Sequence, residues 1–361
     1  MVLIIRDFMF FTPELLKFQD GNPVKTPEDF ALRRKEMLKI LAEEEYGYLP
    51  PVMGETTFEV TDIDYKNCAG HGPLQTLKIF IETQKGKFTL PAYFVAPTNK
   101  EKFPVFMFIN FGESPYHRYY PMEEIVDAGY GVCYIYYQDV TSDDDDFSNG
   151  LAGMFDRPEG NGFGKISLWA YAVSRALDCI LQFPGVDKEN IAVIGHSRLA
   201  KTALWCGAND ERIKYAISNC SGCSGAAYEG IKHEGAETFE LIYKKFPFWF
   251  CDNFKKWIKD GESCPFDQHF LLACCAPRYV MIGSADEDKW ADIYSEQLCC
   301  LAASPAFELL GVEGYKGETD PVKAGYASNE GHICYHLRAG RHYLSRNNWN
   351  RYIEAIDFIN K

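Results

Sequence analysis

The sequence predicts an α/β fold in which a mostly parallel central sheet carries helices on both faces and begins with antiparallel strands. From residue 103 onward, short apolar runs typical of buried strands alternate with helical stretches. Such alternation is typical of a parallel sheet that is covered on both sides. Before these runs, three segments alternate apolar and polar residues, which is the pattern of antiparallel strands.

The elements can be assigned in chain order. A helical pattern occupies residues 13–50, and its part 27–47 is strongly amphipathic. The alternating strands follow at 56–65, 74–83 and 87–97. Buried strands are expected at 103–111, 130–137, 190–195, 214–219, 278–284 and 332–338, and helices at 122–129, 165–184, 198–208, 289–303 and 347–360.

We expect one domain over residues 1–361. Residues 1–55 would form its N-terminal helical segment. The aromatic-rich stretch 224–276 would be an insertion over the carboxyl edge of the sheet, where open α/β sheets bind their ligands.

Charge excludes several partners. The 361 residues include 37 basic and 51 acidic side chains, which gives a formal net charge of −14. With no basic block, the chain is a poor candidate for binding nucleic acid or an anionic membrane.

Residues 1–11 are apolar but interrupted by Arg6 and Asp7, so we expect them to pack on the domain and not to act as a signal peptide. The acidic run 143–146 lacks the glycine and distal glutamate of a calcium loop and is expected to be a solvated loop.

The 13 cysteines are an odd number, and many lie in apolar runs. They are expected to be free thiols, which favours a reducing compartment and a cytoplasmic location. Cys220 and Cys223 form one C-x-x-C, but no second pair and no H-x-H cluster completes a zinc site. We therefore expect no metal and no cofactor, and we expect the protein to be a monomer.

Gly195 and Ser197 follow the buried strand 190–195 directly. Serine hydrolases of the α/β-hydrolase fold place their nucleophile in G-x-S-x-G, on a strained turn between a strand and a helix. Here the second glycine is replaced by Leu199. Two interpretations are open at this point: Ser197 is a nucleophile, or it only caps the helix that follows.

The rest of the chain favours the nucleophile. A serine hydroxyl needs a general base, and that base needs an acid to orient it. In this fold they follow in the order Ser, Asp or Glu, His. Asp286 and Asp288 come after the strand 278–284, and His342 comes after the strand 332–338. Either aspartate could be the orienting acid.

These residues belong to a set of segments that resembles the glucuronoyl esterases, a family of carbohydrate esterases with the α/β-hydrolase fold. The segments are GHSRLAK (195–201), WCGANDERI (205–213), SNCSGCSGAA (218–227), FWFCDNF (248–254), DQHFLLACCAPR (267–278), DKWAD (288–292) and HLRAGRH (336–342). The combination of G-x-S-R-x-x-K with the later D-x-W and G-x-H is far more specific than G-x-S alone. In this family the arginine after the serine belongs to the turn that carries the nucleophile, and a small residue, here Ala200, stands one place beyond Leu199.

The resemblance implies a serine esterase that cleaves esters at the carboxyl carbon of glucuronic acid, in a small-molecule or oligosaccharide substrate. It implies that Ser197 attacks, that His342 transfers the proton and that Arg198 helps to stabilise the oxyanion. It assigns contacts with sugar hydroxyls to Lys201 and Trp290, joined by Glu237.

One residue departs from the family pattern. Many members carry the orienting acid in S-N-E-S-G, where this chain has Cys220. Other members use an acid after the next strand, which matches Asp288 in D-x-W. Two alternatives to a glucuronoyl esterase stay open: an esterase of acetylated or otherwise acylated sugars with the same triad, and a carbohydrate-binding relative that has lost turnover.

Overall fold

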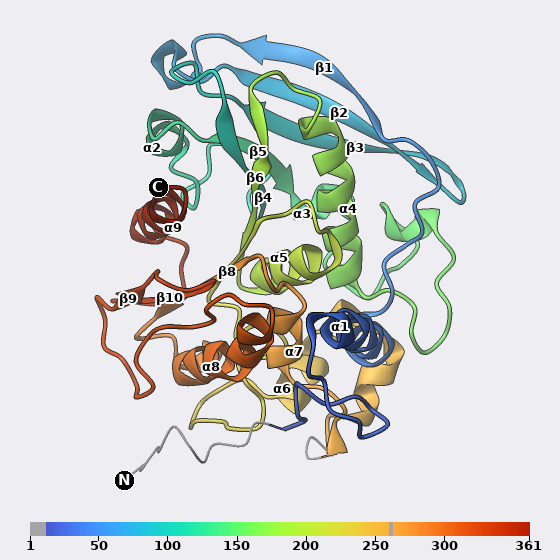
Figure 1. Ribbon diagram of the computed structural model, residues 1–361. Coiled ribbons are helices and arrows are strands. Elements are labelled where there is room, and N and C mark those ends of the chain that lie inside the picture. The colour runs from blue at the N-terminus through green and yellow to red at the C-terminus, as the bar shows by residue number, and fades with distance from the viewer. Residues whose placement is uncertain (1–11, 260–262) are drawn as a thin grey trace.

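The computed structural model describes residues 12–259 and 263–361 (Figure 1). The expectation that residues 1–11 pack on the domain lies outside these described residues. The described residues contain a ten-stranded mixed sheet in the order β1-β2-β3-β5-β4-β6-β7-β8-β10-β9. The strands are β1 (Thr57–Asp64), β2 (Leu74–Thr83), β3 (Gly86–Val95), β4 (Phe103–Asn110), β5 (Gly131–Tyr136), β6 (Val186–His196), β7 (Tyr215–Asn219), β8 (Tyr279–Ala285), β9 (Ala327–Ser328) and β10 (Ile333–Arg338).

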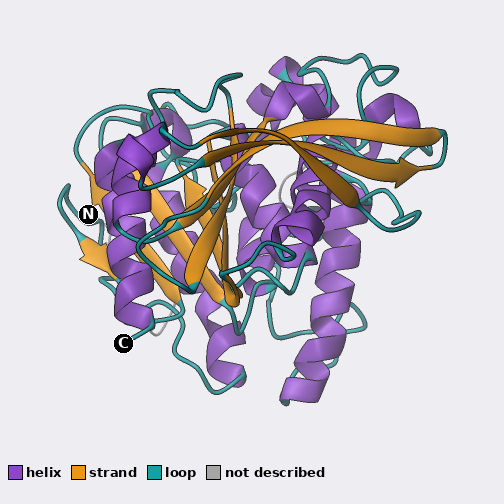
Figure 2. Cartoon of the chain, turned by 90° about the horizontal axis from the view of Figure 1, so that it is seen from above, coloured by secondary structure: helices purple, strands orange, loops and turns teal. Residues whose placement is uncertain are grey.

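Strands β1, β2, β3 and β5 pair antiparallel, and so do β10 and β9, whereas all pairs from β5 to β10 are parallel. The sheet twists strongly, so the strands at its two ends run in clearly different directions (Figure 2). This is the α/β-hydrolase arrangement, and the predicted fold class is confirmed. The short strand β9 carries too few residues to produce a pattern and was not predicted.

Helices cover both faces of the sheet (Figure 1). The helices are α1 (Pro27–Leu41), α2 (Met122–Asp127), α3 (Tyr137–Val140), α4 (Lys165–Ile180), α5 (Arg198–Asn209), α6 (Phe239–Lys245), α7 (Gln268–Ala273), α8 (Ile293–Leu309) and α9 (Arg346–Ile359). Helices α4, α5 and α8 share a large apolar core with α1 and α7 on one face, whereas α2 and α9 pack into a second core on the other. Amphipathic helices bury their apolar stripe in this way when they cover a sheet.

The helical pattern predicted from residue 13 onward is wrong for residues 13–26, which form turns and irregular chain, because the first helix begins only at Pro27. Two further predicted helices differ from expectation. The pattern over 27–47 is an α-helix only to Leu41 and continues as a π-helix over Ala42–Tyr46. The predicted helix 289–303 is divided at Asp292, which has a left-handed backbone and separates a short 3₁₀ turn, Lys289–Ala291, from α8. A break of this kind leaves little trace in apolar periodicity.

In the described residues between β7 and β8 lie α6, α7 and the 3₁₀ turns Pro247–Trp249 and Asp252–Lys256. The proposed division of the chain into an N-terminal segment and this insertion stays a prediction. Within the described ranges, no helix is long and apolar enough to cross a membrane.

The register of the parallel strands positions the site. His196 of β6 lies beside Asn219 of β7, which lies beside Gly283 of β8. The pairing continues one residue past these positions, because Ser197 N–H donates to the Asn219 carbonyl at 3.0 Å and Cys220 N–H donates to the Gly283 carbonyl at 2.8 Å. Three neighbouring strands therefore end on one line, and the loops after them meet at the carboxyl edge of the sheet.

Candidate active site

Ser197 forms the turn between β6 and α5. Its backbone is in an unusual conformation for a residue with a side chain, at φ 59° and ψ −127°. The Ser197 side chain makes no capping hydrogen bond to the helix. The alternative in which Ser197 only starts the helix therefore does not explain the residue, whereas a strained turn that exposes the hydroxyl is the geometry of a nucleophile elbow.

Gly195 allows this turn to close. A Cβ atom at Gly195 would lie 2.0 Å from the Leu199 carbonyl oxygen, which excludes any side chain. Leu199 itself is fully buried in the larger core. The first glycine of the motif is thus required by backbone contact, while the place of the second is filled by a packed leucine.

The loops after β8 and β10 run side by side. Asp286 N–H donates to the Arg338 carbonyl and Glu287 N–H donates to the Gly340 carbonyl, each at 3.0 Å. This pairing carries the next acidic residue, Asp288, to His342.

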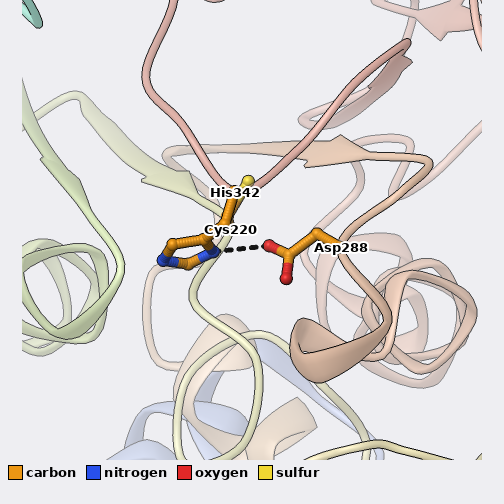
Figure 3. A group of neighbouring side chains, drawn as sticks. All are labelled: Cys220, Asp288 and His342. Atoms are coloured by element: carbon orange, nitrogen blue, oxygen red, sulfur yellow. Dashed lines mark hydrogen bonds and ion pairs between the residues drawn. The ribbon is translucent and has the colours of Figure 1, made fainter.

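His342 is oriented by Asp288. The imidazole Nδ1 lies 2.5 Å from Oδ2 of Asp288, whose side chain is buried, whereas His342 is half-exposed (Figure 3). Asp286 makes no contact with the ring, and its carboxylate accepts the Gly340 N–H at 2.7 Å instead. Of the two aspartates that the sequence left open, only Asp288 is hydrogen-bonded to His342.

Ser197 and His342 line one pocket of about 200 Å³. Its lining comprises Ser197, Arg198, Lys201, Cys220, Ser221, Glu237, Lys245, Phe246, Trp249, Trp290, Ala291 and His342. Within the described structure, no hydrogen bond joins the Ser197 hydroxyl to His342. Such bonds are often long in unliganded hydrolases and tighten when substrate binds. The pocket thus brings together every predicted site residue except Asp288, which supports His342 from behind.

Arg198 is held by an acid of the run 143–146, for which the sequence predicts a solvated loop. Asp143 pairs with Nη1 of Arg198 and accepts a hydrogen bond from Trp249 Nε1 at 2.8 Å. The Asp143 side chain is only 9% exposed, so the expectation of a solvated loop is wrong for Asp143, although Asp144, Asp145 and Asp146 are exposed. Burial of a carboxylate is compensated here by a guanidinium, which an acidic run alone could not reveal.

Aromatic rings complete the surroundings of the guanidinium. The Arg198 guanidinium carbon lies 4.5 Å from the ring centre of Trp249 and 5.2 Å from that of Phe246. Its Nε is buried and has no hydrogen-bond partner in the described part of the chain. Arg198 is therefore fixed in place and still has donor capacity to offer.

Lys201 is buried, and its ammonium group is engaged by the protein. It donates to the carbonyl groups of Ser221 and Cys223 and lies 3.6 Å from the Glu237 carboxylate. Two of its three donors are therefore used by carbonyl groups, and its charge is paired with the Glu237 carboxylate. The Glu237 carboxylate, by contrast, faces the same pocket with spare acceptor positions.

Trp290 is 38% exposed at the pocket, and the Lys245 ammonium lies 4.3 Å from its ring centre. The Trp290 carbonyl accepts the Glu237 N–H at 3.0 Å, which ties two of the predicted sugar contacts to each other. The ring is thus supported from one side and not embedded in the core.

Two further residues near the site had no sequence signal. The ring of His196 lies 4.4 Å from the ring of His342, and burial lowers the pKa of His196 well below its usual value. Glu296 lies beneath the site, where it accepts the Gly222 N–H at 2.9 Å, and burial raises its pKa to about 7. In the sequence, His196 is only the variable position of G-x-S, and Glu296 is only one residue of the predicted helix 289–303.

Cys220 does not have the properties of an orienting acid. Burial raises the pKa of the Cys220 thiol well above its usual value, and the charges of Glu296 and Asp288 raise it further.

All 13 cysteines are free in the structure, and all except Cys68 are buried. The prediction of free thiols is confirmed.

The fold, the strained serine and the histidine–aspartate pair at the carboxyl edge of the sheet define an α/β-hydrolase. A model of the family described as "Glucuronyl esterase, fungi" matches residues 79–311. The chain is 32% identical to carbohydrate esterase MZ0003 of an unknown prokaryotic organism, over 96% of this chain and 88% of that protein. It is 27% identical to 4-O-methyl-glucuronoyl methylesterase 1 of Phanerochaete chrysosporium, over 84% of this chain but only 63% of that protein.

Among solved structures, a promiscuous CE15 esterase from a marine bacterial metagenome superposes with a TM-score of 0.88 at 30% identity. The superposition covers 97% of this chain and 98% of that chain. The chain therefore belongs to the glucuronoyl esterase family and is a carboxylic-ester hydrolase, as the sequence motifs predicted.

Proposed function

We propose that this enzyme cleaves esters at the carboxyl carbon of glucuronic acid, with Ser197, His342 and Asp288 as its catalytic triad. The observation that carries this proposal is the Asp288–His342 hydrogen bond at the rim of the pocket that also holds Ser197 and Arg198. The substrate class is supported by the family and by the relative that is named as a 4-O-methyl-glucuronoyl methylesterase.

In the proposed reaction the Ser197 oxygen attacks the ester carbonyl carbon while His342 Nε2 takes the hydroxyl proton. Collapse of the tetrahedral intermediate expels the alcohol, which receives that proton from His342. Water, activated by the same imidazole, then releases the uronic acid. Asp288 favours each step because it accepts the Nδ1–H and stabilises the imidazolium that forms during attack.

Arg198 supplies two donors to the oxyanion in this proposal, namely its backbone N–H and its guanidinium. The backbone N–H of the residue after the nucleophile is a standard part of the oxyanion hole in this fold. The guanidinium is already held by Asp143, so it needs little reorganisation when charge develops. Loss of one such donor typically costs about 3 kcal/mol of barrier.

Sugar recognition is assigned to Trp290 and Glu237, supported by Lys201. The half-exposed ring of Trp290 offers an apolar face to the sugar, and the Glu237 carboxylate can accept hydrogen bonds from hydroxyl groups. Because two of the three donors of Lys201 are engaged by carbonyl groups and its charge is paired with Glu237, we assign to it the positioning of Glu237 in addition to a sugar contact through its remaining donor.

Kinetics on benzyl and methyl esters of glucuronic acid, compared with acetylated xylan fragments, test the substrate class. The proposal predicts a kcat/KM for the glucuronate esters well above that for the acetylated fragments. A preference for the acetylated fragments would instead favour an acyl-sugar esterase, and turnover of neither would favour a carbohydrate-binding relative.

We also infer that the enzyme works in a reducing compartment, the cytoplasm, as a monomer. The free, buried cysteines support this location because disulfides form readily in oxidising compartments. Thiol counting in denaturant without reductant is expected to find nearly all 13 thiols, and three or more disulfides would overturn the location. A dimer in sedimentation experiments would overturn the oligomeric state.

A further inference from the structure

Three side chains at the carboxyl edge of the sheet converge from three different loops. Cys220 follows β7, Asp288 follows β8 and His342 follows β10 (Figure 3). One ligand atom from each, the Cys220 sulfur, a ring nitrogen of His342 and a carboxylate oxygen of Asp288, lies within 4.8 Å of the other two. The C-x-x-C pattern did not reveal this set, because its members are distant in the chain and Cys223 is not among them.

The donor set has a defined chemical preference. A thiolate, an imidazole and a carboxylate are the ligands that zinc binds, with metal–ligand distances of about 2.0–2.3 Å. Tetrahedral geometry at these lengths separates ligand atoms by about 3.4–3.7 Å. The ring nitrogen and the carboxylate of the 2.5 Å pair must therefore move apart by about 1 Å. His342 can accommodate this movement, because it is half-exposed and lies on a loop.

An ion can reach these ligands from the pocket. Cys220 and His342 both line it, so a water molecule on the pocket side can complete a fourth position. The ligands are supported from behind: Asn219 Nδ2 lies 3.5 Å from the Cys220 sulfur, and Asp288 caps the 3₁₀ turn at Ala291. Such outer contacts orient the ligands of metal sites.

We propose that Cys220, Asp288 and His342 form a binding site for a thiophilic divalent cation such as Zn²⁺, and that this ion reversibly switches the esterase off. The site itself stands on the geometry of the three side chains. Its inhibitory effect rests on the proposed function, in which His342 is the general base.

Inhibition follows from the protons that binding displaces. The ion takes the place of the thiol proton of Cys220, which leaves to solvent. It also binds Nδ1 of His342, and the single proton of the neutral imidazole is transferred from Nδ1 to Nε2, so that Nε2 can no longer accept the proton of Ser197. The Asp288 carboxylate is occupied by the metal and no longer orients the ring. Both functions of the pair are lost until the ion leaves.

Titration of the metal-free enzyme with Co²⁺ or Cd²⁺ tests the site independently of activity. We expect a thiolate-to-metal charge-transfer band that saturates at one equivalent and that Zn²⁺ abolishes by competition. Cys220→Ser is expected to lose the band. Cys223→Ser is the matched control and is expected to keep it, because that buried cysteine lies three residues further along but outside the cluster.

The second measurement is the Zn²⁺ concentration that halves the rate of ester hydrolysis in each protein. Addition of a chelator is expected to restore the rate. Cys220→Ser is expected to raise the half-inhibitory zinc concentration by at least about 10–100-fold, the loss that follows removal of even an outer-shell partner. Cys223→Ser is expected to leave that concentration unchanged.

A band that persists in Cys220→Ser, or the absence of any band in the wild-type enzyme, contradicts the proposed metal site and leaves the proposed function intact. A Cys220-dependent band without loss of hydrolysis overturns the switch and counts against His342 as the base. Absence of hydrolysis in the metal-free enzyme overturns the proposed function, and the band still decides on the site.

Discussion

The Nδ1 atom of His342 lies 2.5 Å from Oδ2 of Asp288, although the two residues are 54 positions apart in the chain. The parallel pairing of β8 with β10 brings the two loops together, and backbone hydrogen bonds between the loops fix their register. The pair therefore depends on the sheet and on no local motif.

Replacing Asp288 should damage catalysis specifically. Asp288→Asn removes the charge that stabilises the imidazolium and favours the wrong tautomer, so kcat is expected to fall about 10³–10⁴-fold. Asp286→Asn is the matched control, because Asp286 belongs to the same loop and does not contact the ring. Equal losses in the two variants would show that the loop, and not the acid, is required.

An acid at position 220 should partly replace the one at 288. The Cys220 sulfur lies within 4.8 Å of both the Asp288 and the His342 ligand atoms, so a carboxylate introduced there can reach the imidazole. In the Asp288→Asn background, Cys220→Glu is expected to raise kcat at least about tenfold, as a restored catalytic group typically does. No gain in a well-folded double variant would contradict this geometry.

Ser197→Ala is expected to abolish hydrolysis and leave the fold intact, because it removes only a hydroxyl that caps no helix. Removal of the nucleophile in a triad typically lowers kcat about 10⁴–10⁶-fold. Thermal unfolding of the variant provides the control for folding. Activity above a tenth of the wild-type level would remove Ser197 from the mechanism.

Asp143 is expected to act through Arg198. Asp143→Asn weakens a charged hydrogen bond, which is worth about 1.5–3 kcal/mol, so a fall in kcat of about tenfold or more is expected with little change in KM. Asp145→Asn, in the exposed part of the same loop, is the control and is expected to leave kcat unchanged. A change confined to KM would indicate that Asp143 serves substrate binding and not the transition state.

Trp290→Ala should affect substrates unequally. The ring lies at the pocket and not against the reacting carbon in the proposed mode, and an aromatic contact of about 0.5–1.5 kcal/mol corresponds to roughly a two- to tenfold rise in KM for glucuronate esters. A simple aryl acetate, which lacks the sugar, is expected to show no such rise. Equal effects on both substrates would make Trp290 a structural residue.

Stability should depend on pH through Glu45, which is buried and has one carboxylate oxygen without a hydrogen-bond partner among the residues that the structure describes. Burial raises its pKa from 4.5 to about 8 in the folded chain. The folded state therefore holds this proton more tightly than the unfolded state, and the stability so gained is present below pH 4.5 and is lost as the pH rises to about 8.

Glu45→Gln cannot titrate, so its Tm is expected to fall less than that of the wild-type protein between pH 4.5 and 8. Glu55→Gln, at an exposed position, is the control and should keep the wild-type slope. Identical slopes in all three proteins would show that Glu45 stays ionised in the folded state.

The central strands could be predicted from sequence because a strand that is buried on both faces must be continuously apolar. The run 103–111 became β4 and the run 214–219 became β7 with shifts of one residue. The π-helix at Ala42–Tyr46 could not be foreseen, because apolar periodicity does not distinguish it from a continued α-helix and its buried Tyr46 packs against Trp205, which is distant in the chain.

The site was predictable where chain order and strand ends constrain it. Ser197 and His342 were identified because each follows a buried strand, whereas the strand end left both Asp286 and Asp288 open and only the D-x-W resemblance favoured Asp288. Asp143 was missed because its partner Arg198 is distant in sequence, and a local acidic run does not distinguish one buried carboxylate from its exposed neighbours. The engagement of Lys201 by two carbonyl groups was hidden for the same reason, because backbone acceptors carry no sequence signal.

The docking of β10 onto β8 has a consequence for how activity arises during folding. Ser197, Arg198 and Asp143, the acid that pairs with this arginine, precede β8 in the chain. The general base, His342, follows β10. A chain that has formed only the strands up to β8 holds a shaped pocket but no proton acceptor. Non-local parallel pairing is slow to form because loop closure must precede it. Onset of ester hydrolysis should therefore mark the last cooperative step of refolding, later than the recovery of helix signal.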